Sequence, residues 1–321
     1  FKKIADVPCC CCGDIMLRKQ DIYKHEQRLI GPKGDDLVKV INEEEKYLRT
    51  AERTACFMIA DAVKGTDKDF AEGIKETEKN LPKYFDKYCK SVLGETYVKS
   101  AEIAGYDAPL SKYIQTTIKG IEKGDAFDRI QFTTMMQGLK GDLSEEDYGK
   151  IENVAMNLPE NKAAVASIYK KYSEKPGAFA HRMFSTAMTT AEHVHPKSLG
   201  GPNNTSNYLA ECAACNNPRG NMSYSEWLKV HPEYPRMVQE HIEHVEMRIV
   251  NGDVPSNYDI YPTDIKKTLS KESEGRMELV VLSADKLREL REAKKAGKEV
   301  DIHAETLALM EQQEKEKAEK A

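Results

Sequence analysis

Two Cys-x-x-Cys pairs far apart in the sequence constrain this chain more than any other feature. The first runs from Cys9 to Cys12 and is followed by Gly13, and the second joins Cys212 to Cys215. Together they offer four thiolates, the ligand set of a closed tetrahedral zinc site, and two such pairs are a much stronger signal than one. We therefore expect the four cysteines to bind one structural Zn²⁺.

The long chain between the two pairs must then return close to where it left. Extending a loop from about 20 to about 200 residues costs on the order of 2 kcal/mol in closure entropy. Structural zinc contributes roughly 10 to 16 kcal/mol of apparent binding free energy in small peptides. A zinc site can therefore tolerate the insertion, above all if the inserted segment folds as a unit with its ends close together.

Composition narrows the class of protein. The 321 residues predict two domains or one domain with a large insertion. Charged residues make up 31%, and no apolar run reaches the roughly 18 to 20 residues of a membrane span, so we expect a cytoplasmic protein without membrane contact. Four consecutive cysteines favour a reduced compartment over a disulfide framework. The net charge of −5 requires any nucleic-acid surface to be local.

The chain start carries a further expectation. The first residues, FKKIADVPCCCC, lack the apolar stretch of a signal peptide. Because there is no initial Met, we expect a trimmed or partly observed chain.

Helical patterns dominate the segment between the cysteine pairs. Apolar residues recur at helical spacing over 40–63, with acidic residues in the first turn and Gly65 beyond the end. Further helices are predicted at 82–92, after a capping Ser144 with Asp147, and at 161–172. Cys56 and Cys89 belong to this block and are expected to be buried small hydrophobes. We expect residues 40–178 to form a helical insertion and residues 1–39 to form the N-terminal half of the zinc-binding core.

Beyond the insertion the pattern changes. A short strand is predicted at 184–190, and Ser223 with Glu226 predicts a capping box that starts a helix. A helix over 236–250 would carry His241 and His244 on a solvated face. Residues 251–277 are expected to be loop-rich, with a possible strand at 278–282 and a charged helical tail after residue 284. These patterns divide the remainder into 179–250 and 251–321.

A second group of metal-binding residue types precedes the second cysteine pair. The sequence reads Glu192-His193-Val194-His195-Pro196, with Gly200-Gly201 and Asn207 following. On an extended strand His193 and His195 share one face and Glu192 points to the other. A strand end or hairpin turn is therefore needed to bring carboxylate and imidazole together, and the Gly and Pro residues supply that turn chemistry.

These motifs, together with Cys-x-x-Cys-Asn and Arg-Gly at Arg219-Gly220, resemble the HNH family of nucleases, which share the ββα-metal fold. The zinc-braced branch, similar to the phage recombination endonuclease VII type, also has one cysteine pair before the motif and one just before its metal-binding Asn. The resemblance covers residues 9–13 and about 189–227. It implies an α+β protein: a zinc-braced ββα-metal nuclease core with a large, mainly α-helical insertion and a helical C-terminal region.

The resemblance also implies roles for single residues. Glu192 and Asn216 would hold one catalytic Mg²⁺ or Mn²⁺, and His193 would be the general base. Asn207 would pin the loop and orient His193, and His195 would contact the scissile phosphate or support the metal. Arg219, with Lys197 and Arg182 as weaker candidates, would neutralise phosphate charge. Glu192 departs from the Asp that is commoner in the family, which changes reach by about one methylene.

The function expected on this basis is metal-dependent hydrolysis of DNA phosphodiester bonds, with RNA left open, in a phage or defence setting. The alternative is a non-catalytic, zinc-containing module that binds nucleic acid or acts as a scaffold. A redox or iron–sulfur role for the Cys9 to Cys12 run is a third interpretation. The insertion and the tail are candidate surfaces for a homodimer or a partner protein.

Overall fold

The computed structural model describes residues 7–159, 161–232 and 234–320, and it divides into two compact units. The core unit combines Phe1–Gln20 with Thr186–Ala321, and the helical unit is Asp21–Ser185. The inserted unit therefore has wider bounds than the expected 40–178, and residues 251–321 belong to the core unit. The expectation about a signal peptide rests on residues 1–12, of which residues 1–6 lie outside the described residues.

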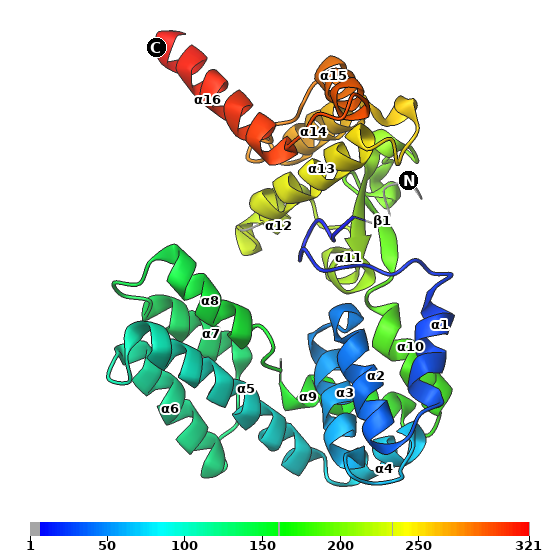
Figure 1. Cartoon of the computed structure of the whole chain (residues 1–321), viewed down its shortest axis with the longest axis vertical. Helices are drawn as coiled ribbons and strands as arrows, with labels where there is room; N and C mark the ends of the chain where they lie inside the picture. Colours follow the sequence, from blue (N-terminus) through cyan, green and yellow to red (C-terminus); the bar gives the residue numbers. More distant parts are fainter. Residues whose placement is uncertain (1–6, 160, 233, 321) are drawn as a thin grey trace. The chain divides into compact units, whose positions relative to one another are not determined.

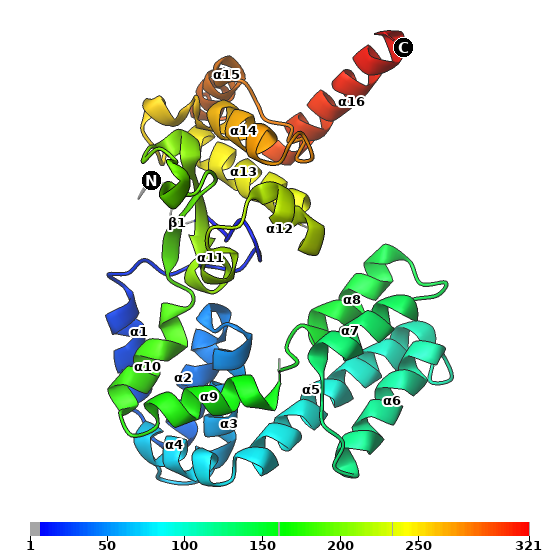
Figure 2. The same cartoon turned by 180° about the vertical axis from the view of Figure 1, so that it is seen from behind.

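The helical unit consists of helices joined by short turns (Figure 2). Its elements are α1 (Ile22–Ile30), α2 (Gly34–Glu44), the 3₁₀ turn η1 (Glu45–Tyr47), α3 (Thr50–Val63), α4 (Phe70–Lys79), α5 (Leu81–Ala104), α6 (Pro109–Glu122), α7 (Arg129–Gly138), α8 (Glu145–Ala155), α9 (Lys162–Tyr172) and α10 (Pro176–Ser185). The 24-residue α5 contacts α3 and α4 as well as α6 and α8, so it connects two groups of helices.

Several helix starts follow from the sequence. Ser144 caps α8 by accepting a hydrogen bond from the Asp147 N–H, and Asn161 caps α9. The helix predicted over 40–63 is instead two helices, because Leu48 and Arg49 adopt extended backbone between η1 and α3. Leu48 is buried, and the apolar periodicity therefore continues across the break. Cys56 and Cys89 are fully buried, as predicted.

The core unit contains the described sheet, an antiparallel hairpin followed by helices (Figure 1). Its elements are β1 (Thr189–His193), η2 (Lys197–Leu199), η3 (Thr205–Asn207), β2 (Tyr208–Cys212), α11 (Ala213–Arg219), α12 (Tyr224–Val230), α13 (Tyr234–Val250), η4 (Ser256–Tyr258), α14 (Tyr261–Glu272), α15 (Ala284–Lys295) and α16 (Ile302–Lys320). The register pairs Thr189 with Cys212 and His193 with Tyr208. The α+β character is therefore confirmed, with helix in large excess.

The two core-unit segments that flank the inserted unit pair with each other at the start of this hairpin. Leu17 forms a parallel bridge with Met188. The Leu17 N–H donates to the Ala187 carbonyl at 2.9 Å, and the Thr189 N–H donates to the Leu17 carbonyl at 2.8 Å. The chain thus leaves the core unit and returns to it at one place, as a shared zinc site requires.

The strand predicted over 184–190 is wrong in its first half. Phe179, Ala180, Met183 and Phe184 are all buried at helical spacing on α10, which packs against α1. The β-branched Thr189 and Thr190 then start β1. Burial of the two phenylalanines on a helix therefore overrides the local strand pattern.

Two features of the C-terminal region also differ from the sequence expectation. Residues 251–277 contain α14, whose stripe of Tyr261, Ile265 and Leu269 is buried in the core of the unit. Residues 278–282 are extended but pair with no strand among the described residues. Their backbone bonds side chains of α13 instead: the Val280 N–H donates to the Gln239 amide oxygen at 3.0 Å. None of the described helices is long and apolar enough to cross a membrane.

Candidate functional site

The four predicted zinc ligands lie together in the core unit. The sulfurs of Cys9, Cys12, Cys212 and Cys215 all lie within 4.8 Å of one another. The Cys12 and Cys212 sulfurs are 4.0 Å apart, close to the roughly 3.8 Å expected across a tetrahedron with zinc–sulfur bonds of about 2.3 Å. This cluster could hold a structural metal ion such as zinc.

Backbone geometry around the first pair arranges the sulfurs. The Gly13 N–H donates to the Cys9 carbonyl at 2.9 Å, and Gly13 adopts a φ of +72°, which favours glycine. The Cys212 N–H points at the Cys9 sulfur at 3.3 Å, and the Cys11 N–H points at the same sulfur at 3.5 Å. Such N–H groups stabilise a thiolate, so the turn suits a metal-bound sulfur.

The donor set itself fits a cation. Thiol–thiol hydrogen bonds raise the pKa of Cys12, chiefly through Cys212, and also raise that of Cys215, chiefly through Cys11. Four thiolates at this spacing repel one another unless a cation neutralises them. Cys11, the buried Glu211 and Cys215 form a second group within 4.8 Å that shares Cys215 with the first.

Helix α13 contacts the chain directly before the Cys9–Cys12 turn. His241 is 1% exposed and its Nδ1 lies 2.8 Å from the Pro8 carbonyl. Burial lowers the pKa of His241 to about 4, so the ring is neutral at pH 7 and donates this hydrogen bond. The solvated position expected for His241 is therefore wrong, since the ring packs beneath the cysteine turn.

The hairpin places Glu192 and Asn216 at one interface. Thr190 and Glu192 are two residues apart on β1 and therefore share a face, against which α11 packs. The Asn216 amide nitrogen donates to the Thr190 hydroxyl at 2.9 Å, and Glu192 forms an ion pair with Arg219 on the next turn of α11. Both proposed metal ligands thus belong to the contact between β1 and α11.

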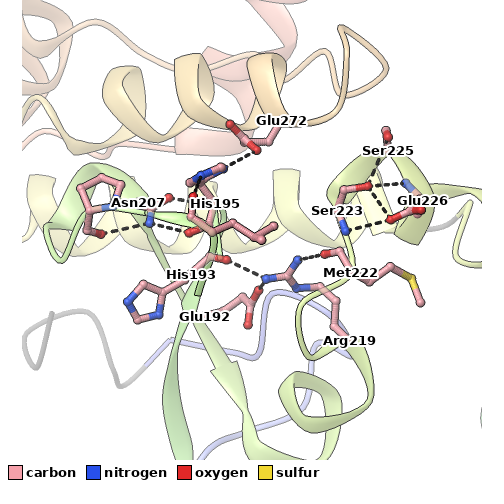
Figure 3. A network of polar contacts seen from close by, with 12 residues as sticks. Glu192, His193, His195, Asn207, Arg219, Met222, Ser223, Ser225, Glu226 and Glu272 are labelled. Carbon is pink, nitrogen blue, oxygen red and sulfur yellow. Dashed lines mark hydrogen bonds and ion pairs between the residues drawn. The ribbon is translucent and has the colours of Figure 1, made fainter. Parts of the chain in front are cut away.

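Arg219 occupies a different position from the one expected for a phosphate contact. It is 2% exposed, and its guanidinium bonds Glu192, the Met222 carbonyl and the His193 carbonyl, the last at 2.6 Å (Figure 3). A guanidinium enclosed in this way cannot reach a phosphate without breaking these bonds. In this structure Arg219 instead links α11 to the end of β1.

His193 ends β1 on the opposite side from Glu192. Figure 3 shows its ring pointing away from the Glu192–Arg219 pair. Its Nε2 lies 2.9 Å from the Asn203 amide oxygen, and the Tyr208 hydroxyl donates to that same oxygen at 3.0 Å. Because the oxygen is the acceptor, Nε2 carries the hydrogen and Nδ1 keeps its lone pair. Asn203 therefore fixes the tautomer, a role that the sequence analysis missed.

Asn207 is fully buried and bonds only backbone groups in the described contacts. Its side-chain oxygen accepts the His195 N–H at 2.8 Å, and its nitrogen donates to the carbonyls of His195 and Pro202, each at 3.0 Å. The amide therefore closes the loop between the two strands at both ends. This bonding is what a loop-pinning residue requires.

His195 is engaged on both ring nitrogens. Nδ1 lies 2.9 Å from a carboxylate oxygen of Glu272 on α14, and Nε2 lies 3.1 Å from the Leu199 carbonyl (Figure 3). The Glu272 hydrogen bond, followed by that to Leu199, raises the pKa of His195 above its ordinary value of 6.5. In this structure both ring nitrogens therefore contact protein groups. Glu272 lies in the segment 251–277 that the sequence predicts to be loop-rich, and no sequence pattern identifies it as a contact of His195.

The two weaker candidates for a phosphate contact, Lys197 and Arg182, belong to different units. Lys197 is exposed on η2 of the hairpin loop, where a phosphate could reach it. Arg182 belongs to the helical unit, where its guanidinium pairs with the buried Glu52 at 2.8 Å.

No similar protein supports or contradicts this geometry. The sequence matches no family model, and neither curated proteins nor solved structures returned a similar chain.

Proposed function

We propose that this protein is a zinc-braced HNH endonuclease that hydrolyses DNA phosphodiester bonds with one divalent cation. The observation that carries the proposal is the arrangement of an antiparallel hairpin, a helix and a four-cysteine cluster. Cys215 of that cluster is followed directly by Asn216, which faces Thr190 across the β1–α11 contact. The cluster thereby fixes a candidate catalytic ligand opposite the strand that carries Glu192.

The donor atoms suit a hard cation. A carboxylate oxygen of Glu192 and the amide oxygen of Asn216 are ligands that Mg²⁺ and Mn²⁺ prefer, with water and phosphate oxygens filling the other positions. Arg219 pairs with the Glu192 carboxylate, and Glu192 together with Asn216 would hold the cation. When bound, the cation supplies Lewis-acid stabilisation of charge on the phosphate and on the departing oxygen.

The chain's own groups account for the proton transfer. His193 accepts a proton from the attacking water at Nδ1, because Asn203 holds the hydrogen on Nε2. The imidazolium that forms is stabilised by the same amide oxygen. Arg219 keeps the carbonyl of His193 and the carboxylate of Glu192 in place, and Lys197 supplies positive charge on the exposed loop.

The test is nicking of a supercoiled plasmid in Mg²⁺ or Mn²⁺ by the parent and His193→Ala. Loss of a general base costs roughly 10²- to 10⁴-fold, so nicking should fall by at least that lower figure. His303→Ala is the matched control, because His303 is 68% exposed on α16 and pairs only with Glu243 in the described contacts. Equal nicking by His193→Ala and parent shows that the base is misassigned.

The same proteins should be assayed on duplex, branched and single-stranded DNA and on RNA, with metal content measured. About one zinc per chain is expected from four thiolate ligands. Iron in place of zinc would support the redox or iron–sulfur interpretation instead.

One observation favours the non-catalytic alternative. Glu192 is already neutralised by Arg219, and the His193 ring points away from that pair. A scaffold that binds nucleic acid without cutting it would be stable with this arrangement. Gel-shift binding of DNA with no strand cleavage in any divalent metal would support that module and overturn the nuclease.

A further inference from the structure

Helix α14 bonds the hairpin loop along one face. The contacts are from the Tyr261 hydroxyl to the Tyr208 carbonyl at 2.9 Å, from the Thr268 hydroxyl to the Ser206 carbonyl at 2.8 Å, and between Glu272 and His195 at 2.9 Å. The three α14 residues are seven and then four positions apart, so they form a single stripe on the helix. The helix therefore bonds the hairpin on both sides of its turn, at His195 before it and at Ser206 and Tyr208 after it.

The His195 ring lies between two acceptors. Nδ1 faces a carboxylate and Nε2 faces a carbonyl, and neither group can donate a hydrogen bond. Both contacts are made at once only when both ring nitrogens carry hydrogen. This arrangement of acceptors therefore suits the imidazolium, which can bond α14 on one side and the loop on the other.

The loop held in this way carries the residue that orients the base. It turns tightly at Gly200, with φ +95°, and at Gly201, where a Cβ would lie 1.9 Å from the His195 carbonyl oxygen. Asn203 follows directly and fixes the His193 tautomer. Contacts thus run from Glu272 through His195 and Leu199 to the loop that presents Asn203.

We propose that Glu272 is a positioning residue: through His195 it holds the loop of residues 196–204 in the conformation in which Asn203 orients the His193 base. The catalytic part of this inference rests on the proposed nuclease function. The loop-holding part concerns the folded protein alone. Through Glu272, helix α14 thus contributes to the geometry of the site, although it lies outside the segment that resembles the family.

The charged groups near His195 shift the pKa of its ring. Glu272 favours the imidazolium and the neighbouring Lys271 opposes it, with Glu272 the larger influence. The pKa of His195 is raised, so the doubly bonded ring is fully present below pH 6.5 and is lost as pH rises through the higher value of the folded protein. Cleavage should therefore fall at alkaline pH, and this alkaline limb is set by His195.

Glu272→Gln tests the proposal because it removes the charge and keeps the shape. The pKa of His195, followed by NMR and assigned by loss of its signal in His195→Gln, should fall. The alkaline limb of cleavage should move to lower pH. At pH 8 the rate should drop by roughly tenfold to a hundredfold, the usual cost of a slightly misplaced reacting group.

Two controls and a second readout accompany this variant. Glu274→Gln removes an exposed carboxylate that pairs with Arg276, and it should match the parent throughout. Thr268→Val loosens the loop at Ser206 without touching the charge, so the alkaline limb should stay in place. Trypsin cleavage after the exposed Lys197 reports on loop mobility at fixed pH and should be faster in Glu272→Gln than in Glu274→Gln.

The outcomes separate the two proposals. An unchanged His195 pKa, or equal trypsin cleavage in the two Gln variants, overturns the positioning role even if DNA is cut. Absence of cleavage in every protein overturns the nuclease. A lowered His195 pKa with faster trypsin cleavage would still establish that Glu272 holds the loop.

Discussion

At the scale of single residues, the geometry of the candidate site depends on buried amide and thiol side chains. Asn207 has no exposed surface and satisfies three backbone groups of the hairpin loop. A side chain of this kind is expensive to replace, because each buried group left without a partner costs about 1 to 3 kcal/mol.

Asn207→Ala should therefore destabilise the core unit by about 3 kcal/mol. Trp227 on α12 is the single tryptophan of the chain and is 5% exposed, so its fluorescence during urea unfolding reports on this unit. Asn217→Ala, at an exposed position of α11, is the control and should change stability by no more than about 0.5 kcal/mol. Equal midpoints for the two variants would contradict the role given to Asn207.

Residues with a spacing rule could be predicted from sequence, whereas those defined by a distant partner could not. The cysteine pairs and Asn207 stand within short motifs, and the structure brings the cysteines together. Glu272 has no such motif, because its role exists only once α14 lies against the loop. Arg219 was expected to contact phosphate, and the sequence could not show that it is buried in an ion pair with Glu192.

At the scale of elements, helix-capping residues could be predicted from the sequence, whereas the packing partners of buried segments could not. Ser144 and Ser223 both start helices as expected, since each side chain satisfies a local backbone N–H. The missed helix α14 has Pro262 in its first turn, where proline is tolerated, and only four buried residues, Tyr261, Pro262, Ile265 and Leu269. The expected strand at 278–282 fails because α13 side chains take the bonds that a neighbouring strand would have made.

The capping box of α12 gives a prediction at this scale. The Ser223 hydroxyl accepts the Glu226 N–H at 3.3 Å, and the Glu226 carboxylate accepts the Ser223 N–H at 3.2 Å. Ser223→Ala should lower the stability of the core unit by about 1 kcal/mol, measured again by Trp227 fluorescence. Ser198→Ala on the exposed loop is the comparison, and a loss of similar size there would argue against the cap as the cause.

At the scale of the whole molecule, the sequence predicted an insertion but not its limits. The zinc ligands required the chain to leave and return at one place, and the bridge between Leu17 and Met188 provides this. The boundary at 40 was wrong because α1 and α2 contact helices of the inserted unit. Amphipathic periodicity locates helices, but it does not say which neighbours they pack against.

Zinc removal should therefore affect the two units differently. The helical unit contributes none of the four clustered cysteines, while the cluster joins the N-terminal turn of the core unit to β2 and α11. A strong chelator should shift Trp227 fluorescence and abolish cleavage even in excess Mg²⁺, while much of the helical circular dichroism remains. Restoring zinc should restore both signals. A zinc-free protein that still cuts DNA would show that the position of Asn216 does not depend on the cysteine cluster.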